Sequence, residues 1–177
     1  FKGASILDVG SGTGDFLSFM NSKGYEVTGV ENNPKASLIS QKNDIKTHEN
    51  TSELPDNSFD LISSINTLHY EKNAEDMMLA LNEFRRVLKP GGGLYISTVG
   101  PKHEIYNLSK PLGNHENLIQ DFGFRTGEQF FFFDNERYLD YYLSKIFTNV
   151  ETGRVTEKLM TMQLDFLISY ATKPLDN

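Results

Sequence analysis

The chain has 177 residues and no cysteine, which excludes disulfides, a thiolate nucleophile and cysteine-bound zinc or iron–sulfur clusters. Its formal charge of −7 repels phosphate backbones and disfavours nucleic acid as a partner. The length fits one domain over 1–177, and no apolar stretch resembles a signal peptide or reaches the ~20 residues of a membrane span. We therefore expect a cytoplasmic protein, and because the chain begins at Phe1 we expect a segment before it.

Apolar runs alternate with helical patterns over the first hundred residues, which is typical of a mostly parallel α/β sheet. The expected strands lie near 4–9, 25–31, 45–48, 58–66 and 93–99, and the expected helices near 15–24, 34–41 and 73–88. Between 100 and 133 the alternation lapses, and we expect a substrate-side insertion there. A helix near 135–146 and strands near 148–154 and 163–171 then predict an antiparallel hairpin that closes the sheet.

Three glycines, Gly10, Gly12 and Gly14, follow the first predicted strand at alternate positions. They stand where a strand becomes a helix, at the sheet edge where α/β proteins bind ligands, and glycine allows a ligand to approach the backbone closely. Glu31 ends the second predicted strand, where a carboxylate can accept hydrogen bonds from both hydroxyls of a ribose. The turn and the acid together predict a nucleoside-containing cofactor, without deciding which one.

Four stretches in order carry a family resemblance: ILDVGSGTG (6–14), VTGVENN (27–33), LPDNSFDLISS (54–64) and FRRVLKPGGGLYIS (84–97). Their sequence and spacing closely resemble the class I S-adenosylmethionine-dependent methyltransferases. The resemblance implies a doubly wound, Rossmann-like α/β fold in three α/β/α layers. Its seven-stranded, mostly parallel sheet would have the order 3-2-1-4-5-7-6, with the last strand antiparallel.

The resemblance also implies roles for individual residues toward S-adenosylmethionine and its product S-adenosylhomocysteine. Gly10, Gly12 and Gly14 would run beneath the methionine part of the cofactor. Asp8 would organise the turn and reach the amino group through water, and the backbone carbonyl of Ser64 would face that group.

The ribose and the adenine have their own expected contacts. Glu31 would hold the ribose hydroxyls, and Asn32 would lie against the adenine. Many relatives carry an aspartate after the third strand that accepts the adenine amino group, and here either Glu49 or Asn50 can take that place. No pair of acids has the spacing of a metal site, so we predict no metal.

Two absences narrow the reaction. Without cysteine, attack on a pyrimidine ring through a thiolate adduct is impossible, and the [DN]-P-P-[YF] tetrad of many exocyclic-amine and glutamine methyltransferases is replaced by SSINTLHY (63–70). We therefore expect a small-molecule acceptor methylated on oxygen, with nitrogen as the second possibility. The resemblance to bacterial relatives with a similarly short core further implies a metabolite or a surface-sugar precursor as this acceptor.

An oxygen acceptor usually needs a base, and histidine is the natural choice near neutral pH. His69 follows the fourth predicted strand and His103 follows the fifth, so both are candidate catalytic residues, with core packing as the alternative for each. The segment 122–147 is rich in aromatics and includes QFFFFD (129–134). This segment is expected to form an acceptor pocket or lid, or a buried extended stretch that leads into a helix capped by Asp134 or Asn135. Both can hold for different rings, and exposed rings could also serve a dimer interface.

Two other functions stay open at this point. An NAD-linked oxidoreductase would share the glycine turn and the acid, but the G-x-G-x-G spacing and the later motifs disfavour it. A non-catalytic module that binds S-adenosylmethionine is also possible, because no residue is an unambiguous base. As partners we expect a small-molecule substrate, neither nucleic acid nor membrane, and a monomer or homodimer.

Overall fold

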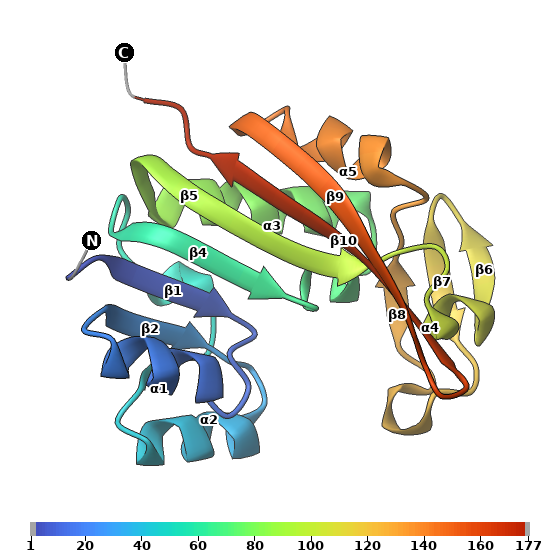
Figure 1. The fold of residues 1–177 in the computed structure, drawn as a ribbon, viewed down its shortest axis with the longest axis horizontal. Helices are drawn as coiled ribbons and strands as arrows, with labels where there is room; N and C mark the ends of the chain where they lie inside the picture. The colour runs from blue at the N-terminus through green and yellow to red at the C-terminus, as the bar shows by residue number, and fades with distance from the viewer. Residues whose placement is uncertain (1–2, 176–177) are drawn as a thin grey trace.

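Seven strands form the main sheet of the computed structural model, which describes residues 3–175 (Figure 1). They are β1 (Ser5–Val9), β2 (Glu26–Val30), β3 (Lys46–His48), β4 (Phe59–Ile65), β5 (Leu88–Val99), β9 (Thr148–Leu159) and β10 (Met162–Thr172). Their order across the sheet is β3-β2-β1-β4-β5-β10-β9, and β10 runs antiparallel to both neighbours while the other pairings are parallel. The predicted order and antiparallel strand are confirmed; Phe1 lies outside the described residues.

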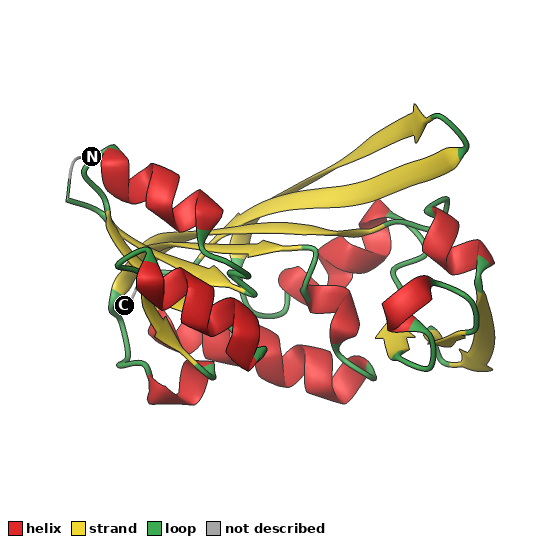
Figure 2. Ribbon diagram, turned by 90° about the horizontal axis from the view of Figure 1, so that it is seen from below, coloured by secondary structure: helices red, strands yellow, loops and turns green. Residues whose placement is uncertain are grey.

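Helices cover both faces of this sheet (Figure 2). They are α1 (Asp15–Ser22), α2 (Pro34–Lys42), α3 (Ala74–Val87) and α5 (Glu136–Leu143). The short helix α4 (Glu104–Asn107) lies outside these layers, and η1 (Thr51–Glu53), η2 (Leu68–Tyr70) and η3 (Gly123–Arg125) are single 3-10 turns. Alternating residues of β1 point to opposite faces: Ile6 packs with Leu17 of α1, whereas Leu7 joins the larger core under α3 and α5. The strand pattern therefore builds the layers on both sides.

A second, three-stranded sheet fills the region where the alternation of the sequence lapses. It is antiparallel in the order β6 (Ser109–Gly113), β7 (Glu116–Ile119), β8 (Gln129–Phe131) and lies beyond the carboxyl end of β5 (Figure 1). Its apolar residues Ile119 and Phe130 pack with Val99 at the end of β5. The small sheet is thus anchored at the edge of the main sheet to which ligands of this architecture bind.

The aromatic segment before α5 is core. Phe130 and Phe132 pack in the core of the small sheet, while Phe131 and Phe133 point the other way into the main core, and all four are buried. Asn135 then caps α5 by accepting a hydrogen bond from the Tyr138 N–H at 3.1 Å. The four phenylalanines therefore form a buried extended stretch, which was one of the two alternatives predicted for this segment. They do not form an acceptor lid.

Two details differ from the expected elements. Leu88, expected on the face of the third helix, is the first residue of β5, which continues through the glycines 91–93. Gly93 pairs with Leu61 of β4, and the register shifts between Phe59 and Leu61, so the glycine run forms an irregular start of the strand. No helix within residues 3–175 is long and apolar enough to cross a membrane.

Candidate functional site

Three neighbouring strands end at one level of the sheet, which brings the predicted cofactor residues together. Val9 of β1 pairs with Val30 of β2 and with Ser64 of β4. The residues that follow these three positions therefore share the carboxyl edge, the place where open α/β sheets bind ligands. Gly10 and Glu31, distant in the sequence, become neighbours in this way.

The three glycines of the turn serve different steric needs. All have positive φ: +79° at Gly10, +55° at Gly12 and +82° at Gly14. A Cβ on Gly10 would lie 2.0 Å from Thr67 Cγ2, and one on Gly14 would lie 2.5 Å from Ser40 Oγ of α2. A Cβ on Gly12 would meet nothing within 4 Å. Gly10 and Gly14 allow close packing, whereas Gly12 leaves the edge open toward a cavity that it lines.

Glu31 ties the glycine turn to the end of β2. Its Oε2 accepts a hydrogen bond from the Gly12 N–H at 2.8 Å, and its Oε1 accepts one from the Asn33 N–H at 2.7 Å. A carboxylate has about four acceptor positions, so both oxygens retain capacity for ribose hydroxyls. The two backbone bonds fix the direction of the carboxylate before any ligand arrives.

Asp8 lies beneath the turn and outside the cavity lining. It is buried, and its Oδ1 accepts a hydrogen bond from Ser63 Oγ at 2.6 Å. Burial raises the pKa of the Asp8 carboxyl to about 6, against the lowering effect of the Ser63 hydrogen bond. This position suits the predicted support of the turn, which stays a prediction, as does its contact with the cofactor amino group.

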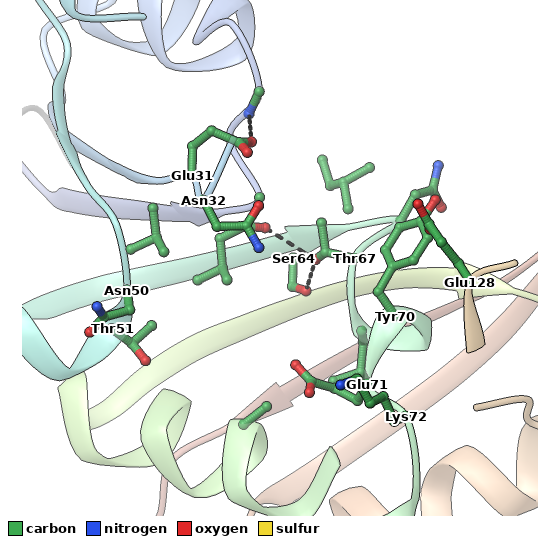
Figure 3. A pocket seen from close by; sticks show the side chains of 18 of the residues that line it. Glu31, Asn32, Asn50, Thr51, Ser64, Thr67, Tyr70, Glu71, Lys72 and Glu128 are labelled. Atoms are coloured by element: carbon green, nitrogen blue, oxygen red, sulfur yellow. Dashed lines mark hydrogen bonds between the residues drawn. The ribbon is translucent and has the colours of Figure 1, made fainter. Parts of the chain in front are cut away.

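A hydroxyl pair links β4 to β1 at the floor of the site. Thr67 Oγ1 lies 2.7 Å from Ser64 Oγ and donates to the carbonyl of Val9 at 3.1 Å (Figure 3). The same threonine closes over Gly10. Thr67 was missed by the sequence analysis, because its importance comes from the contact with Gly10, which no local pattern records.

A cavity of about 1040 Å³ opens at this edge. Most of the predicted cofactor residues line it: Gly10, Gly12, Glu31, Asn32, Glu49, Asn50 and Ser64. Asp8 and Gly14 do not. Since sites for drug-sized ligands usually measure ~300–1,000 Å³, this volume suits a nucleoside cofactor together with a small acceptor.

Asn50 and Glu49 differ in how free their side chains are. Asn50 caps η1: its Oδ1 accepts a hydrogen bond from the Ser52 N–H at 3.1 Å, and Glu53 accepts one from the Asn50 N–H at 3.4 Å. No such capping bond involves the exposed Glu49 side chain among the described residues. The acceptor for the adenine amino group stays open between the two, with Glu49 the less engaged.

The other end of the cavity is built by the small sheet and the residues around η2 (Figure 3). The Arg125 guanidinium lies over the Tyr70 ring, 4.1 Å from its centroid, and pairs with Glu128 at 3.0 Å. Gln129 donates to the carbonyl of Lys72 at 3.1 Å. These contacts hold the segment before β8 against the chain after η2, so residues 125–129 supply part of one wall of the cavity.

Neither candidate catalytic histidine lines the cavity. His69 is buried between Tyr70 and Phe130, with ring centroids at 4.3 and 5.0 Å, and its Nδ1 is 3.3 Å from Thr98 Oγ1. Burial lowers the pKa of the His69 imidazole to about 3. This is the packed position that the sequence analysis kept as the alternative, and the role as base stays a prediction.

His103 caps the short helix α4, where its Nδ1 accepts a hydrogen bond from the Ile105 N–H at 3.2 Å. Its ring packs against Phe166 at 5.2 Å, and burial lowers its pKa. Because one ring nitrogen is engaged in the cap, the arrangement favours a structural role over proton transfer. Within residues 3–175 no three acidic or histidine side chains lie together as a metal site.

Comparisons with known proteins agree with this geometry. The model of the methyltransferase domain family matches residues 7–96, about half of the chain. A demethylmenaquinone methyltransferase from Chlorobaculum parvum is 39% identical over 97 residues, which cover 51% of this chain and 39% of that protein. The chain thus aligns with well under half the length of this curated relative.

Solved structures of similar fold cover nearly the whole chain. A SAM-dependent methyltransferase from Methanosarcina mazei has a TM-score of 0.79 at 23% identity, with 99% of this chain and 95% of that one covered. One from Mesorhizobium loti has a TM-score of 0.70 at 19% identity, covering 96% and 91%. From the family match and the strand order together, the chain belongs to the methyltransferase domain family, among the class I S-adenosylmethionine-dependent methyltransferases.

Proposed function

We propose that this chain transfers a methyl group from S-adenosylmethionine to a small-molecule acceptor. The observation that carries the proposal is the convergence of Gly12, Glu31 and Ser64 on a cavity of about 1040 Å³ at the carboxyl edge. A nucleoside needs a hydrogen-bond acceptor for its ribose hydroxyls and a turn without an obstructing side chain. Glu31 and Gly12 supply these two features at the carboxyl edge. The strand order of the fold and the family membership support the same reading.

The cavity meets the steric and hydrogen-bonding needs of this cofactor. The open side of Gly12 gives room where a Cβ would intrude, and the Glu31 carboxylate is already oriented by two backbone N–H groups. Glu31 would hold the ribose, the glycine turn and the Ser64 carbonyl would hold the methionine part, and Asn32 with Glu49 or Asn50 would hold the adenine. When bound, the cofactor supplies an electrophilic methyl group on a sulfonium.

The protein's own task is then mainly alignment. Methyl transfer is an in-line displacement with a good leaving group, so its rate depends on holding the acceptor atom on the line through the methyl carbon and on excluding water. The Tyr70, Arg125 and Glu128 wall closes the cavity opposite the glycine turn. That wall is where an acceptor can be oriented.

For the acceptor atom we propose oxygen, with nitrogen as the alternative. The absence of cysteine and of the [DN]-P-P-[YF] tetrad supports this choice, and the negative charge of the chain disfavours a nucleic-acid acceptor. The expected histidine base does not support it, because His69 and His103 are buried outside the cavity lining.

Two measurements test the proposal. Isothermal titration calorimetry should show S-adenosylhomocysteine binding to the chain more tightly than NAD. A panel of small hydroxylated and amine metabolites should then give at least one acceptor-dependent release of S-adenosylhomocysteine. Tighter binding of NAD would overturn the cofactor assignment, whereas cofactor binding without release for any acceptor would indicate a binding module.

A further inference from the structure

Glu71 is a carboxylate that the description of the cofactor site leaves without a task. It follows η2 directly, lines the cavity and is half-buried (Figure 3). Among the described residues its side chain has neither a hydrogen bond nor an ion pair. Burial, together with the nearby Asp76 carboxylate, raises its pKa. A cation placed beside a half-buried, unpaired carboxylate stabilises its ionised form.

The other acids that line the cavity are differently situated. Glu31 is held by the N–H groups of Gly12 and Asn33. Glu128 accepts two hydrogen bonds from the Arg125 guanidinium, at 3.0 and 3.3 Å. Glu49 is exposed to water, which solvates its charge. Glu71 is therefore the half-buried lining carboxylate whose charge is not balanced within the described part of the chain.

The net charge of the residues that line the cavity is negative, which favours the binding of a further cation. Four carboxylates line it, Glu31, Glu49, Glu71 and Glu128, against the two cations Lys72 and Arg125. Arg125 is paired with Glu128, and the Lys72 side chain is exposed, where solvent screens it. S-adenosylmethionine carries a single net positive charge and balances one of the two excess negative charges. One negative charge then remains in excess among the residues that line the cavity.

We propose that the methyl acceptor carries a protonated amine, which the Glu71 carboxylate holds by a charge-assisted hydrogen bond. The amine serves as the anchor that orients the molecule. The methylated atom is either a hydroxyl oxygen elsewhere on the same molecule, which loses its proton to solvent, or the amine nitrogen itself after it has passed a proton to the Glu71 carboxylate and regained its lone pair. The inference rests on the proposed function, since it assigns Glu71 to the acceptor and the glycine turn to the cofactor. It predicts a substrate class: small amines in preference to neutral molecules of the same shape.

Calorimetry on the chain saturated with S-adenosylhomocysteine tests the proposal. The probes are matched pairs: tyramine and para-ethylphenol, ethanolamine and ethylene glycol, cadaverine and pentanediol. The proteins are the wild type, Glu71→Gln and the control Glu75→Gln, which removes an exposed acid in the first turn of α3, outside the cavity lining. Glu71→Asp serves as the conservative variant that keeps the charge.

We expect the amine of at least one pair to bind the wild type, and its neutral partner to bind about 10- to 100-fold more weakly, as for loss of a charge-assisted hydrogen bond. Glu71→Gln should weaken amine binding by a similar factor, Glu71→Asp should restore part of it, and Glu75→Gln should change nothing. Affinity for S-adenosylhomocysteine should be the same in all four proteins, which also shows that the variants fold.

Four results would overturn the proposal: no amine binds the loaded wild type, neutral partners bind as well as amines, amine binding survives Glu71→Gln, or Glu71→Gln weakens S-adenosylhomocysteine itself. The last result would assign the carboxylate to the amino group of the cofactor. Failure of the wild type to bind S-adenosylhomocysteine at all would instead refute the proposed function, so the two failures are separate.

Discussion

The two ends of the cavity are built by different means. At the proposed cofactor end the backbone sets the geometry: Gly10 and Gly12 have positive φ, and Glu31 bonds to backbone N–H groups. At the proposed acceptor end side chains from separate segments meet, with Arg125 stacked on Tyr70 at 4.1 Å. Backbone requirements restrict the residue types allowed at fixed spacings, whereas side-chain contacts can be met by many combinations. The first kind of site is therefore visible in a sequence and the second is not.

The largest expected effect comes from a substitution in the glycine turn. Gly10→Ala places a Cβ 2.0 Å from Thr67 Cγ2 at a residue with φ of +79°, so both the contact and the conformation are unfavourable. We expect a loss of about 3–4 kcal/mol in the free energy of unfolding, the range of severe core substitutions, and no measurable S-adenosylhomocysteine binding. Urea unfolding and calorimetry measure both.

Two further variants separate the clash from the conformation. Gly12→Ala has open space around its Cβ, so it should cost only the ~1–2 kcal/mol of a left-handed residue. Adding Thr67→Ser to Gly10→Ala removes the clashing methyl group and keeps the hydroxyl that bonds to Val9, so part of the stability should return. Equal losses in the Gly10 and Gly12 variants would contradict the packing role assigned to Gly10.

The next effect concerns affinity and not folding. Glu31→Ala should weaken S-adenosylhomocysteine binding by about 1.5–3 kcal/mol, the contribution of hydrogen bonds to a charged group. The fold should survive, because Glu31 follows the last residue of β2 and is not part of the core. Calorimetry compares it with Glu26→Ala, an exposed acid at the other end of β2. An unchanged dissociation constant would place the ribose elsewhere.

The same contrast explains which features could be predicted. The main sheet, α3 with its Asn73 cap and the glycine turn were predicted because periodicity and caps are local. The small sheet was missed, because β6 is exposed along most of its length and contains Pro111 and Gly113, and β7 and β8 have only four and three residues. The contact between Tyr70 and Arg125 was not predicted, because the two residues are 55 positions apart in the sequence and only the tertiary fold brings them together.

The next prediction concerns the pH dependence that buried His69, which packs against Tyr70, gives to the free energy of unfolding. Its pKa is about 3 when folded and ~6.5 when unfolded, so the unfolded state binds the extra proton between these values. Stability is full above pH ~6.5 and declines as pH falls toward 3, by about 2 kcal/mol between pH 6.5 and 5. Urea unfolding at these pH values measures the decline, and His69→Gln should remove this contribution.

A matched control keeps the interpretation of the His69 experiment specific. His115→Gln removes a half-buried histidine that contacts Asp134 at 3.1 Å, and it should leave the contribution of His69 in place. If His69 instead acts as the catalytic base, turnover on an identified acceptor should titrate with the folded imidazole and should fall ~10²–10⁴-fold in His69→Gln. A neutral, packed imidazole predicts turnover without that titration.

The smallest effect lies at the cofactor end and has the opposite pH sign. The pKa of Asp8 is about 6 when folded, above its ordinary 3.8, so the folded state binds the extra proton between these values. The stability contribution of Asp8 is full below pH 3.8 and is lost as pH rises through 6.

Asp8→Asn keeps an oxygen that can accept from Ser63 and removes the buried charge. It should therefore unfold at higher urea at pH 7.5, by about 1 kcal/mol after relaxation of the turn, and show no gain at pH 4. Asp15→Asn, which changes an exposed acid in the first turn of α1, should show no such pH-dependent difference. A gain at pH 4 as large as that at pH 7.5 would mean that the buried charge is not what limits stability beneath the glycine turn.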